Sequence, residues 1–235
     1  MGFASCRTLL VLTVCLLGSG CSKGITRATA ATVLLVKGDV VFGQAERNQF
    51  RSVAPSSKIR DGDIVRTSDG AAINLVLVPG AFVQVSENSE IKIEELSLTK
   101  DGNETAGGMF DRSARVRLSR GRVSVLFSRS DTSGSHFALI TKQTIISPDS
   151  DCLFSVWTDG STTRATCARG ELSGAGDGQT PVRIATGYSH QWPTASKEPL
   201  AASAEASTQM DVMVSLEAEK ELLDQAARWQ NRRVF

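Results

Sequence analysis

The feature that most constrains the fold is a long series of short apolar runs, each bounded by residues that favour turns. Gly, Pro, Asp, Asn and Ser separate these runs, which lie at residues 33–36, 73–78, 82–85, 91–93, 116–118, 123–127, 137–140, 153–157 and 182–184. Many short strands with frequent turn signals are typical of all-β proteins. The sequence therefore predicts an all-β domain over residues 33–192, either a short β-helix of the solenoid kind or a sandwich.

Alternation within the runs predicts which side chains enter the core. Val123, Val125 and Phe127 fall on one face of a strand and Ser124 on the other, as a half-buried strand requires. Residues 73–78 carry apolar side chains on both faces, so we expect this strand to be the most buried one of the domain.

Glycine steps predict the turns between the strands. Asp61-Gly62 and Asp69-Gly70 supply positive φ angles and short polar side chains, which together turn the chain sharply. A basic residue followed by glycine also recurs shortly before an aliphatic residue, in Lys37-Gly38, Arg120-Gly121 and Arg169-Gly170. Successive coils of a β-helix would reuse such a corner.

The N-terminus has the layout of a secretory signal peptide over residues 1–20. Arg7 precedes an apolar run at residues 8–17, which is too short to span a bilayer, and small residues lead to Cys21. The junction resembles a bacterial lipoprotein signal, which predicts that Cys21 is lipidated and becomes the first mature residue. Ser22 in the second mature position resembles the sorting pattern for the outer membrane. Ordinary cleavage after residue 20, leaving Cys21 as a free thiol, stays open.

The charge balance limits the partners. The formal net charge is +1, and removal of residues 1–20 leaves 25 basic and 25 acidic residues. A neutral chain with 6% aromatic residues lacks the basic, aromatic surface of nucleic-acid binders, so we expect no nucleic-acid partner. We expect the membrane to be contacted through lipid on Cys21, followed by a tether over residues 21–32.

Two cysteines remain in the predicted mature domain, Cys152 and Cys167. In an oxidising compartment we expect them to form a disulfide. Asp159-Gly160 lies between them and predicts a two-residue hairpin turn, in which Thr158 pairs with Ser161 and the two cysteines face each other. A redox-active role is the alternative, although the spacing is not C-x-x-C.

The chain beyond the β domain divides into a linker and a helix. Residues 193–207 have the small and polar composition of a linker, and residues 208–235 predict an amphipathic helix with acids early and arginines late. Val212, Leu216 and Leu223 would form the apolar stripe that packs on the β domain. A helix that instead binds a partner is the alternative.

Several motifs between residues 36 and 98 resemble the FecR domain. They are KGDV at residues 37–40, IRDGDIVRT at residues 59–67 and GAAINL at residues 70–75, and residues 116–125 and 169–172 supply the later glycine-led strands. The resemblance implies a periplasmic β-helix-like domain. In the namesake members it belongs to a transmembrane anti-sigma regulator that reads the state of an outer-membrane iron-siderophore transporter. We expect this chain to be a stand-alone, lipid-anchored module of that type.

No residue pattern indicates catalysis. His136 and His190 are the only histidines, neither has a second ligand at metal-binding spacing, and no Gly-x-Ser-x-Gly motif occurs within residues 33–192. We therefore expect no enzyme, no catalytic, cofactor-binding or metal-binding residues, and no cofactor. A secreted hydrolase is the least favoured function.

The sequence predicts a non-enzymatic lipoprotein of the bacterial cell envelope that faces the periplasm, anchored in the outer membrane. Its β domain would be a binding or scaffold module for an envelope protein or a glycan, with the exposed side chains of Arg115, Arg117, Arg122 and Trp157 as the binding surface. The alternative is a signalling or regulatory module in envelope or iron-uptake signal transduction, which acts with a membrane partner through the C-terminal helix.

Overall fold

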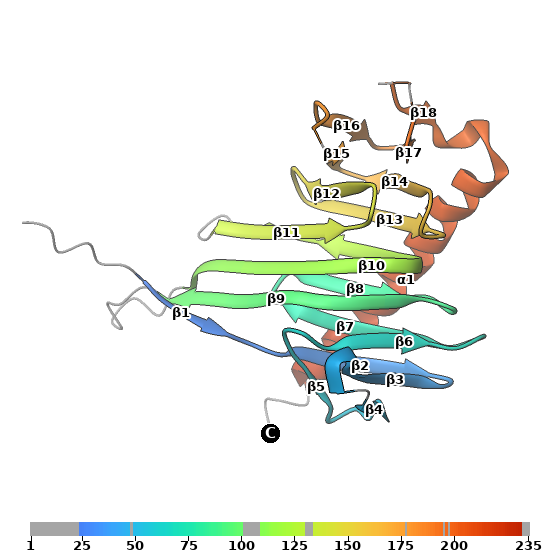
Figure 1. Ribbon diagram of the computed structural model, residues 1–235. Helices are drawn as coiled ribbons and strands as arrows, with labels where there is room; N and C mark the ends of the chain where they lie inside the picture. Colours follow the sequence, from blue (N-terminus) through green and yellow to red (C-terminus); the bar gives the residue numbers. More distant parts are fainter. Residues whose placement is uncertain are drawn as a thin grey trace, which may run out of the picture.

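The computed structural model describes residues 24–231, except for residues 48, 101–108, 130–133, 177, 195 and 197. The predicted signal peptide and Cys21 lie outside the described residues. Most of the described chain is strand, and a single long helix follows at its C-terminal end (Figure 1). The predicted fold class, all-β with a C-terminal helix, is confirmed.

The strands form two β-sheets, sheet 1 and sheet 2, which share one long strand. Sheet 1 contains β1 (Ile25–Ala28), β3 (Val40–Gln44), β4 (Gln49–Ser52), β6 (Ile64–Thr67), β9 (Glu90–Lys100), β10 (Met109–Phe127), β11 (Gly134–Ile140), β12 (Thr144–Pro148), β15 (Glu171–Gly176) and β16 (Val182–Ala185). Their order is β4-β3-β6-β9-β10-β11-β12-β15-β16, and β1 pairs with β9 on the same edge as β6. The η1 turn (Ala45–Arg47) joins β3 to β4.

Sheet 2 contains β2 (Ala31–Lys37), β5 (Lys58–Ile59), β7 (Ala72–Val78), β8 (Ala81–Val85), the second part of β10, β13 (Cys152–Thr158), β14 (Thr163–Arg169), β17 (Tyr188–Trp192) and β18 (Leu200–Ala201). Their order is β5-β2-β7-β8-β10-β13-β14-β17-β18. Up to Arg120, β10 pairs with β9 in sheet 1, and from Gly121 it pairs with β8 and β13 in sheet 2. The chain thus passes repeatedly between sheet 1 and sheet 2 (Figure 1).

The main apolar core is built by both sheets. Val123, Val125 and Phe127 are buried in it, as their alternation predicted. Ile73 and Leu75 of β7 are also fully buried, which confirms that residues 73–78 lie deep in the fold. Strand β13 is equally buried on both faces, because the C-terminal helix covers the side that alternation alone would leave to solvent.

The basic-glycine corners are confirmed where the chain changes sheet. Gly38, Gly121 and Gly170 have φ angles of 70°, 91° and 88°, and they lie between β2 and β3, within β10, and between β14 and β15. At Gly121 a Cβ atom would also lie 2.1 Å from Oγ of Ser89. Both the positive φ and the close approach therefore require glycine at this corner.

The predicted boundaries of the tether and the linker differ from the structure. Strand β1 lies within the predicted tether and pairs with β9, so the fold begins earlier than residue 33. Strand β18 and the η3 turn (Ala202–Ala204) lie within the predicted linker, and helix α1 spans Ala206–Asn231. Across the described parts of the chain, no helix is both long and apolar enough to cross a membrane.

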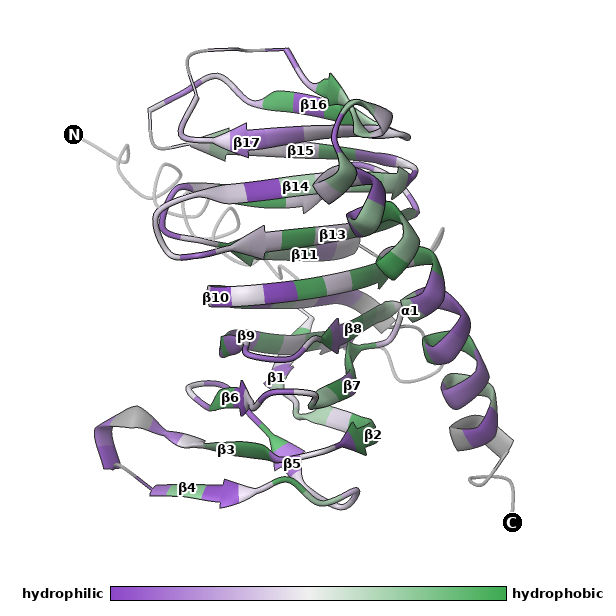
Figure 2. Cartoon of the chain, turned by 90° about the vertical axis from the view of Figure 1, so that its right-hand side faces the viewer, coloured by the Kyte–Doolittle hydropathy of each residue, from purple (hydrophilic) through white to green (hydrophobic). Residues whose placement is uncertain are grey.

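Helix α1 packs on the outer face of sheet 2, as Figure 2 shows. The prediction that it packs on its own domain is therefore correct, but the predicted stripe is wrong: Leu216 and Leu223 are 49% and 50% exposed. The buried face instead carries polar and small residues together with one leucine, namely Thr208, Asp211, Ser215, Ala218, Leu222 and Ala226.

The composition of the outer face of sheet 2 explains why α1 buries its polar and small residues. A row of polar residues runs across five adjacent strands beneath α1, namely Asn74, Gln84, Ser124, Ser155 and Thr166, which are neighbours in the ladder. Buried polar groups need hydrogen-bonding partners, and α1 supplies them to four of these five residues: Asn74 Nδ2 donates to Gln225 Oε1 at 2.8 Å, Gln84 Nε2 donates to Glu221 Oε2 at 3.0 Å, and Ser155 and Thr166 both donate to Asp211. A purely apolar helix face would leave this row unsatisfied.

Candidate functional site

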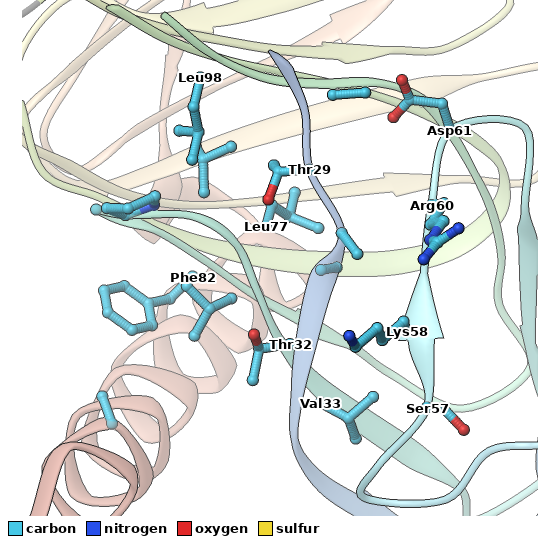
Figure 3. A pocket seen from close by; sticks show the side chains of 18 of the residues that line it. Thr29, Thr32, Val33, Ser57, Lys58, Arg60, Asp61, Leu77, Phe82 and Leu98 are labelled. Carbon is cyan, nitrogen blue, oxygen red and sulfur yellow. The ribbon is translucent and has the colours of Figure 1, made fainter. Parts of the chain in front are cut away.

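A groove of about 1060 Å³ opens where β2, β5 and the end of β7 diverge (Figure 3). One wall carries the charged side chains of Lys58 and Arg60, and the other carries Leu77, Phe82 and Leu98. The groove thus joins an apolar wall to a basic one.

Strand pairing explains why the chain leaves this space open. The ladder between β2 and β7 ends at the pair Thr32 and Val76, and a bulge between Val76 and Val78 interrupts the ladder between β7 and β8. Thr32 also pairs with Lys58 of β5 on its other edge, and the chain before β2 turns away to join sheet 1 as β1. The last residues of β7 therefore continue beyond the strand that would cover their edge.

The Asp-Gly motif at Asp61 fixes the rim of the groove. Oδ1 of Asp61 accepts the backbone N–H of Leu96 at 2.8 Å, and the N–H of Arg60 donates to Oδ2 of Asp63 at 2.8 Å. Partial burial raises the pKa of Asp61, and the bond from Leu96 acts in the opposite direction. These contacts attach the turn to β9, so the motif builds the rim and is turn chemistry, as predicted.

The groove combines an open strand edge with polar and apolar side chains. Its described lining contains hydroxyl groups and three charged side chains but no histidine or cysteine. A free strand segment beside apolar side chains is the arrangement that binds extended peptides by adding a strand. Among the described residues, no cluster of three His, Cys, Asp or Glu is placed to hold a metal ion.

The two histidines lie far from the groove lining and have different surroundings. His136 is exposed on β11, whereas His190 of β17 is 5% exposed and packs edge-on against Trp192, with ring centroids 4.5 Å apart. Burial lowers the pKa of His190 because it disfavours the charged imidazole, and the contact with the backbone of Glu198 opposes this effect. His190 is therefore a packing residue in this structure.

The cysteines are neighbours in the core. Cys152 and Cys167 are buried free thiols whose Sγ atoms lie 3.9 Å apart. A hydrogen bond with Cys167 and burial both raise the pKa of Cys152, which keeps this thiol protonated. The structure brings the predicted pair together without a bond between them, and the disulfide stays a prediction.

The predicted hairpin register between the cysteines is wrong by two residues. Thr158 pairs with Thr163 and Phe154 with Cys167, so the turn contains four residues rather than two. Oδ1 of Asp159 accepts the N–H groups of Ser161 and Thr162 at 2.8 and 2.7 Å, which stabilises this wider turn. Because side chains alternate with a period of two, the slip keeps both cysteines on the core face.

The predicted binding surface of arginines and tryptophan is divided between the two sheets. Arg115 and Arg117 lie in the part of β10 that belongs to sheet 1, where Arg117 Nε bonds Glu94 Oε1 at 2.6 Å. Arg122 and Trp157 pair with each other in sheet 2, and Nη2 of Arg122 reaches Asp211 of α1 at 2.8 Å. The four side chains therefore do not form one exposed surface, since Arg122 and Trp157 are half-buried in sheet 2.

Asp211 is a residue that the sequence reasoning missed. Its carboxylate is 1% exposed, bonds Arg122 and Arg164 at 2.8 and 2.7 Å, and accepts from Oγ1 of Thr166 at 3.2 Å. These partners come from β10 and β14, far away in sequence. No local signal could therefore have identified the cluster that attaches α1.

Comparison with known proteins finds a match to one family and partial matches to solved structures. Residues 63–173 match the family described as FecR protein. Two crystal structures of a protein provisionally described as an anti-sigma factor from Parabacteroides distasonis show TM-scores of 0.41 and 0.40 and identities of 13% and 11%. Each match covers 58% of this chain and 57% of that chain, so the chain spans little more than half of their length. No curated protein matches the chain.

The fold and the groove define a class of protein: a two-sheet β module with an open groove at the end of β7 and a helix fixed across one face. Within that class, residues 63–173 of this chain form a FecR domain. The family that the sequence motifs indicated is confirmed. The match includes the motif at residues 70–75 and the later strands at residues 116–125 and 169–172, and it begins within the motif at residues 59–67.

Proposed function

We propose that this protein is a non-enzymatic regulatory module of the bacterial cell envelope, which transmits a signal by binding another envelope protein. The observation that supports it is the FecR domain at residues 63–173, because the family is regulatory. This is the function that the sequence offered as the alternative to a binding or scaffold module. Iron-uptake signalling is one form that the regulation would take.

The groove is the proposed contact for the partner. Its free β7 segment would receive an extended chain through backbone hydrogen bonds, while the half-buried Phe82 and Leu98 would receive its apolar side chains. Lys58 and Arg60 at the rim favour a segment that carries an acidic residue.

We propose from the sequence that the protein is anchored in the cell envelope. Cleavage after residue 20 and lipidation of Cys21 would anchor the module, with the β domain facing the periplasm from the outer membrane. Ser22 supports outer-membrane sorting.

Transcript profiling of the native host tests the regulatory function. Deletion of the gene should change the levels of a defined set of transcripts, and the wild-type chain should restore them. Ser56→Trp puts an indole into the mouth of the groove at an exposed position, so it should fail to restore them. Ser119→Trp, at an exposed position of β10 outside the groove, is the matched control and should restore them.

Each outcome separates one part of the proposal from another. If deletion changes no transcript, the regulatory function is wrong and the binding or scaffold module is the better description. If both tryptophan variants restore the transcripts, the regulation stands but the groove is not the contact.

A further inference from the structure

The outward face of α1 carries an apolar seam with coiled-coil spacing. Met213, Leu216, Lys220, Leu223 and Ala227 follow each other at intervals of three and four residues, which are the a and d positions of a heptad pattern. Met213 is 66% exposed, Leu216 49% and Leu223 50%, and Lys220 and Ala227 are also exposed. This seam lies on the helix face that points away from sheet 2.

The seam is not needed to hold the helix in place. The opposite face is fixed by Asp211, by Leu222 in a small cluster with Leu126 and Leu153, and by the hydrogen bond between Asn74 and Gln225. The seam is therefore presented on a helix that is already formed and attached. A preformed helix loses less conformational entropy on binding than a disordered segment does.

We propose that this outer seam binds one amphipathic helix of a partner protein, as a short two-helix coiled coil. The inference rests on the proposed function, in that the partner is a protein, and it gives that partner a defined chemistry. The partner helix carries an apolar a/d seam, an acidic residue opposite Lys220, and basic residues along the border that faces Glu217 and Asp224.

The charges of α1 determine the partner's charges. The charged residues at the flanking e positions are Glu217 and Asp224, both acidic and exposed, whereas Glu219 at a g position already pairs with Arg169 of β14. Pairing at these positions sets partner choice in coiled coils, so lysine or arginine is the complementary residue. Lys220 at a central a position requires an acid across the seam, because an unpaired ammonium within an apolar contact is costly.

A second copy of this chain does not fit the seam. In a parallel pair Lys220 lies opposite Lys220 of the second copy, and in an antiparallel pair, where a positions pack against d positions, it lies opposite Leu216 or Leu223 without an acid across the seam. In a parallel pair the acidic flanks would also repel each other. Lys220 therefore acts against self-pairing of the seam.

An anionic membrane surface does not fit it either. Helices that lie on membranes border their apolar face with lysine and arginine, whereas Glu217 and Asp224 border this seam. The acids would be repelled by anionic lipid headgroups.

Synthetic peptides test the proposal on the purified full chain by calorimetry. The first is about four heptads long, with Leu at a and d, Lys at e and g, and one Glu at a central a position. The second has Glu at e and g and Lys at that a position. The first should bind and the second should bind at least about tenfold more weakly. Equal binding, or binding of neither peptide, would overturn the proposal.

Variants of α1 make the test specific to the seam. Leu216→Glu with Leu223→Glu should weaken binding of the first peptide about tenfold or more without lowering Tm, because both residues are exposed. The Lys220→Glu variant should reverse the preference at the central a position. It should bind a peptide with Lys at that position more tightly than a peptide with Glu there. Met210→Glu is the matched control, at 54% exposure but off the seam, and should leave Kd unchanged within about twofold.

Two further measurements test the excluded occupants. By sedimentation, the wild-type chain should not self-associate through α1, and Lys220→Leu should create a dimer. A wild-type dimer that Leu216→Glu dissociates would show that the occupant is a second copy. Flotation on anionic vesicles that this variant abolishes would assign the seam to a membrane. The transcript response of Ser56→Trp depends on neither result, so the proposed function and this inference can fail separately.

Discussion

The carboxylate of Asp211 is almost completely buried between two arginines that different strands of sheet 2 provide. Burial of a charge is tolerated only when partners replace the lost water, and here Arg122, Arg164 and Thr166 do so. Removal of the carboxylate would leave two arginines without their shared counter-ion at this interface. Single residues of this kind determine where α1 can lie, although they add little to the apolar core.

Oxidation of the cysteine pair is the first prediction at this scale. We expect Cys152 and Cys167, which are already neighbours at 3.9 Å between Sγ atoms, to form a disulfide in an oxidising envelope. In the chain-entropy model a loop of this length stabilises the fold by about 3 kcal/mol. Mass spectrometry of the unreduced protein should show a species lighter by two hydrogens, with the two cysteine peptides linked. Alkylation of both thiols without prior reduction would contradict it.

His190 should make the fold sensitive to mild acid. Burial lowers its pKa in the folded state, so below the unfolded-state pKa of about 6.5 the unfolded chain binds more protons than the folded one. Stability should therefore fall as the pH falls through about 6.5. Urea midpoints at about pH 7.5 and pH 5 should differ less for His190→Gln than for the wild type. His136→Gln, at an exposed site, should behave like the wild type.

Among the secondary-structure elements, α1 has two faces of different composition. Its docked face is polar and small because sheet 2 offers a polar row, and its apolar residues are left outside. The same row includes Ser124 of β10 and Ser155 of β13, which are buried because α1 covers this face of the sheet. The attachment of a helix to a sheet here depends on hydrogen bonds and ion pairs more than on apolar area.

A pair of adjacent leucines tests this arrangement. Leu222 is fully buried against Leu126 and Leu153, whereas Leu223 is 50% exposed. Leu222→Ala should lower the free energy of unfolding by about 2 to 4 kcal/mol. Leu223→Ala should change it by less than about 0.5 kcal/mol. Chemical denaturation of both variants would measure the difference, and equal losses would show that the helix does not pack as described.

For the whole molecule, the early start of β1 shortens the connection to any lipid anchor. Only residues 22–24 separate Cys21 from β1, and a chain of this length spans at most about 10 Å. A lipidated Cys21 would therefore hold the end of β1 close to the membrane surface, instead of letting the domain move on a long tether.

The anchor itself is tested by Cys21→Ser. We expect the variant to remain as unprocessed precursor and to be absent as mature protein from the detergent-extracted envelope fraction, because the lipid is added to the cysteine thiol. Immunoblotting of fractions and intact mass would show both effects. A correctly cut, soluble mature variant would indicate ordinary cleavage after residue 20.

The sequence by itself determined the features that depend on near neighbours in the chain. Alternation placed Val123, Val125 and Phe127 in the core, and the basic-glycine corners marked where the chain changes sheet. Both follow from geometry that each residue carries wherever it lies: the period of two in a strand and the positive φ that glycine tolerates. The FecR motifs could also be identified from the sequence, because each motif is a continuous stretch of neighbouring residues.

Only the tertiary structure decided the features that depend on distant partners. The groove exists because the pairing between β2 and β7 ends at Thr32 and Val76. The segment that precedes β2 in the chain is β1, which pairs with β9 of the other sheet. The docked face of α1 was decided by polar residues of five strands, so an apolar stripe read from the helix alone selected the wrong side. A helix buries the face that complements its neighbour, and the neighbour here is assembled from segments that lie far apart in the sequence.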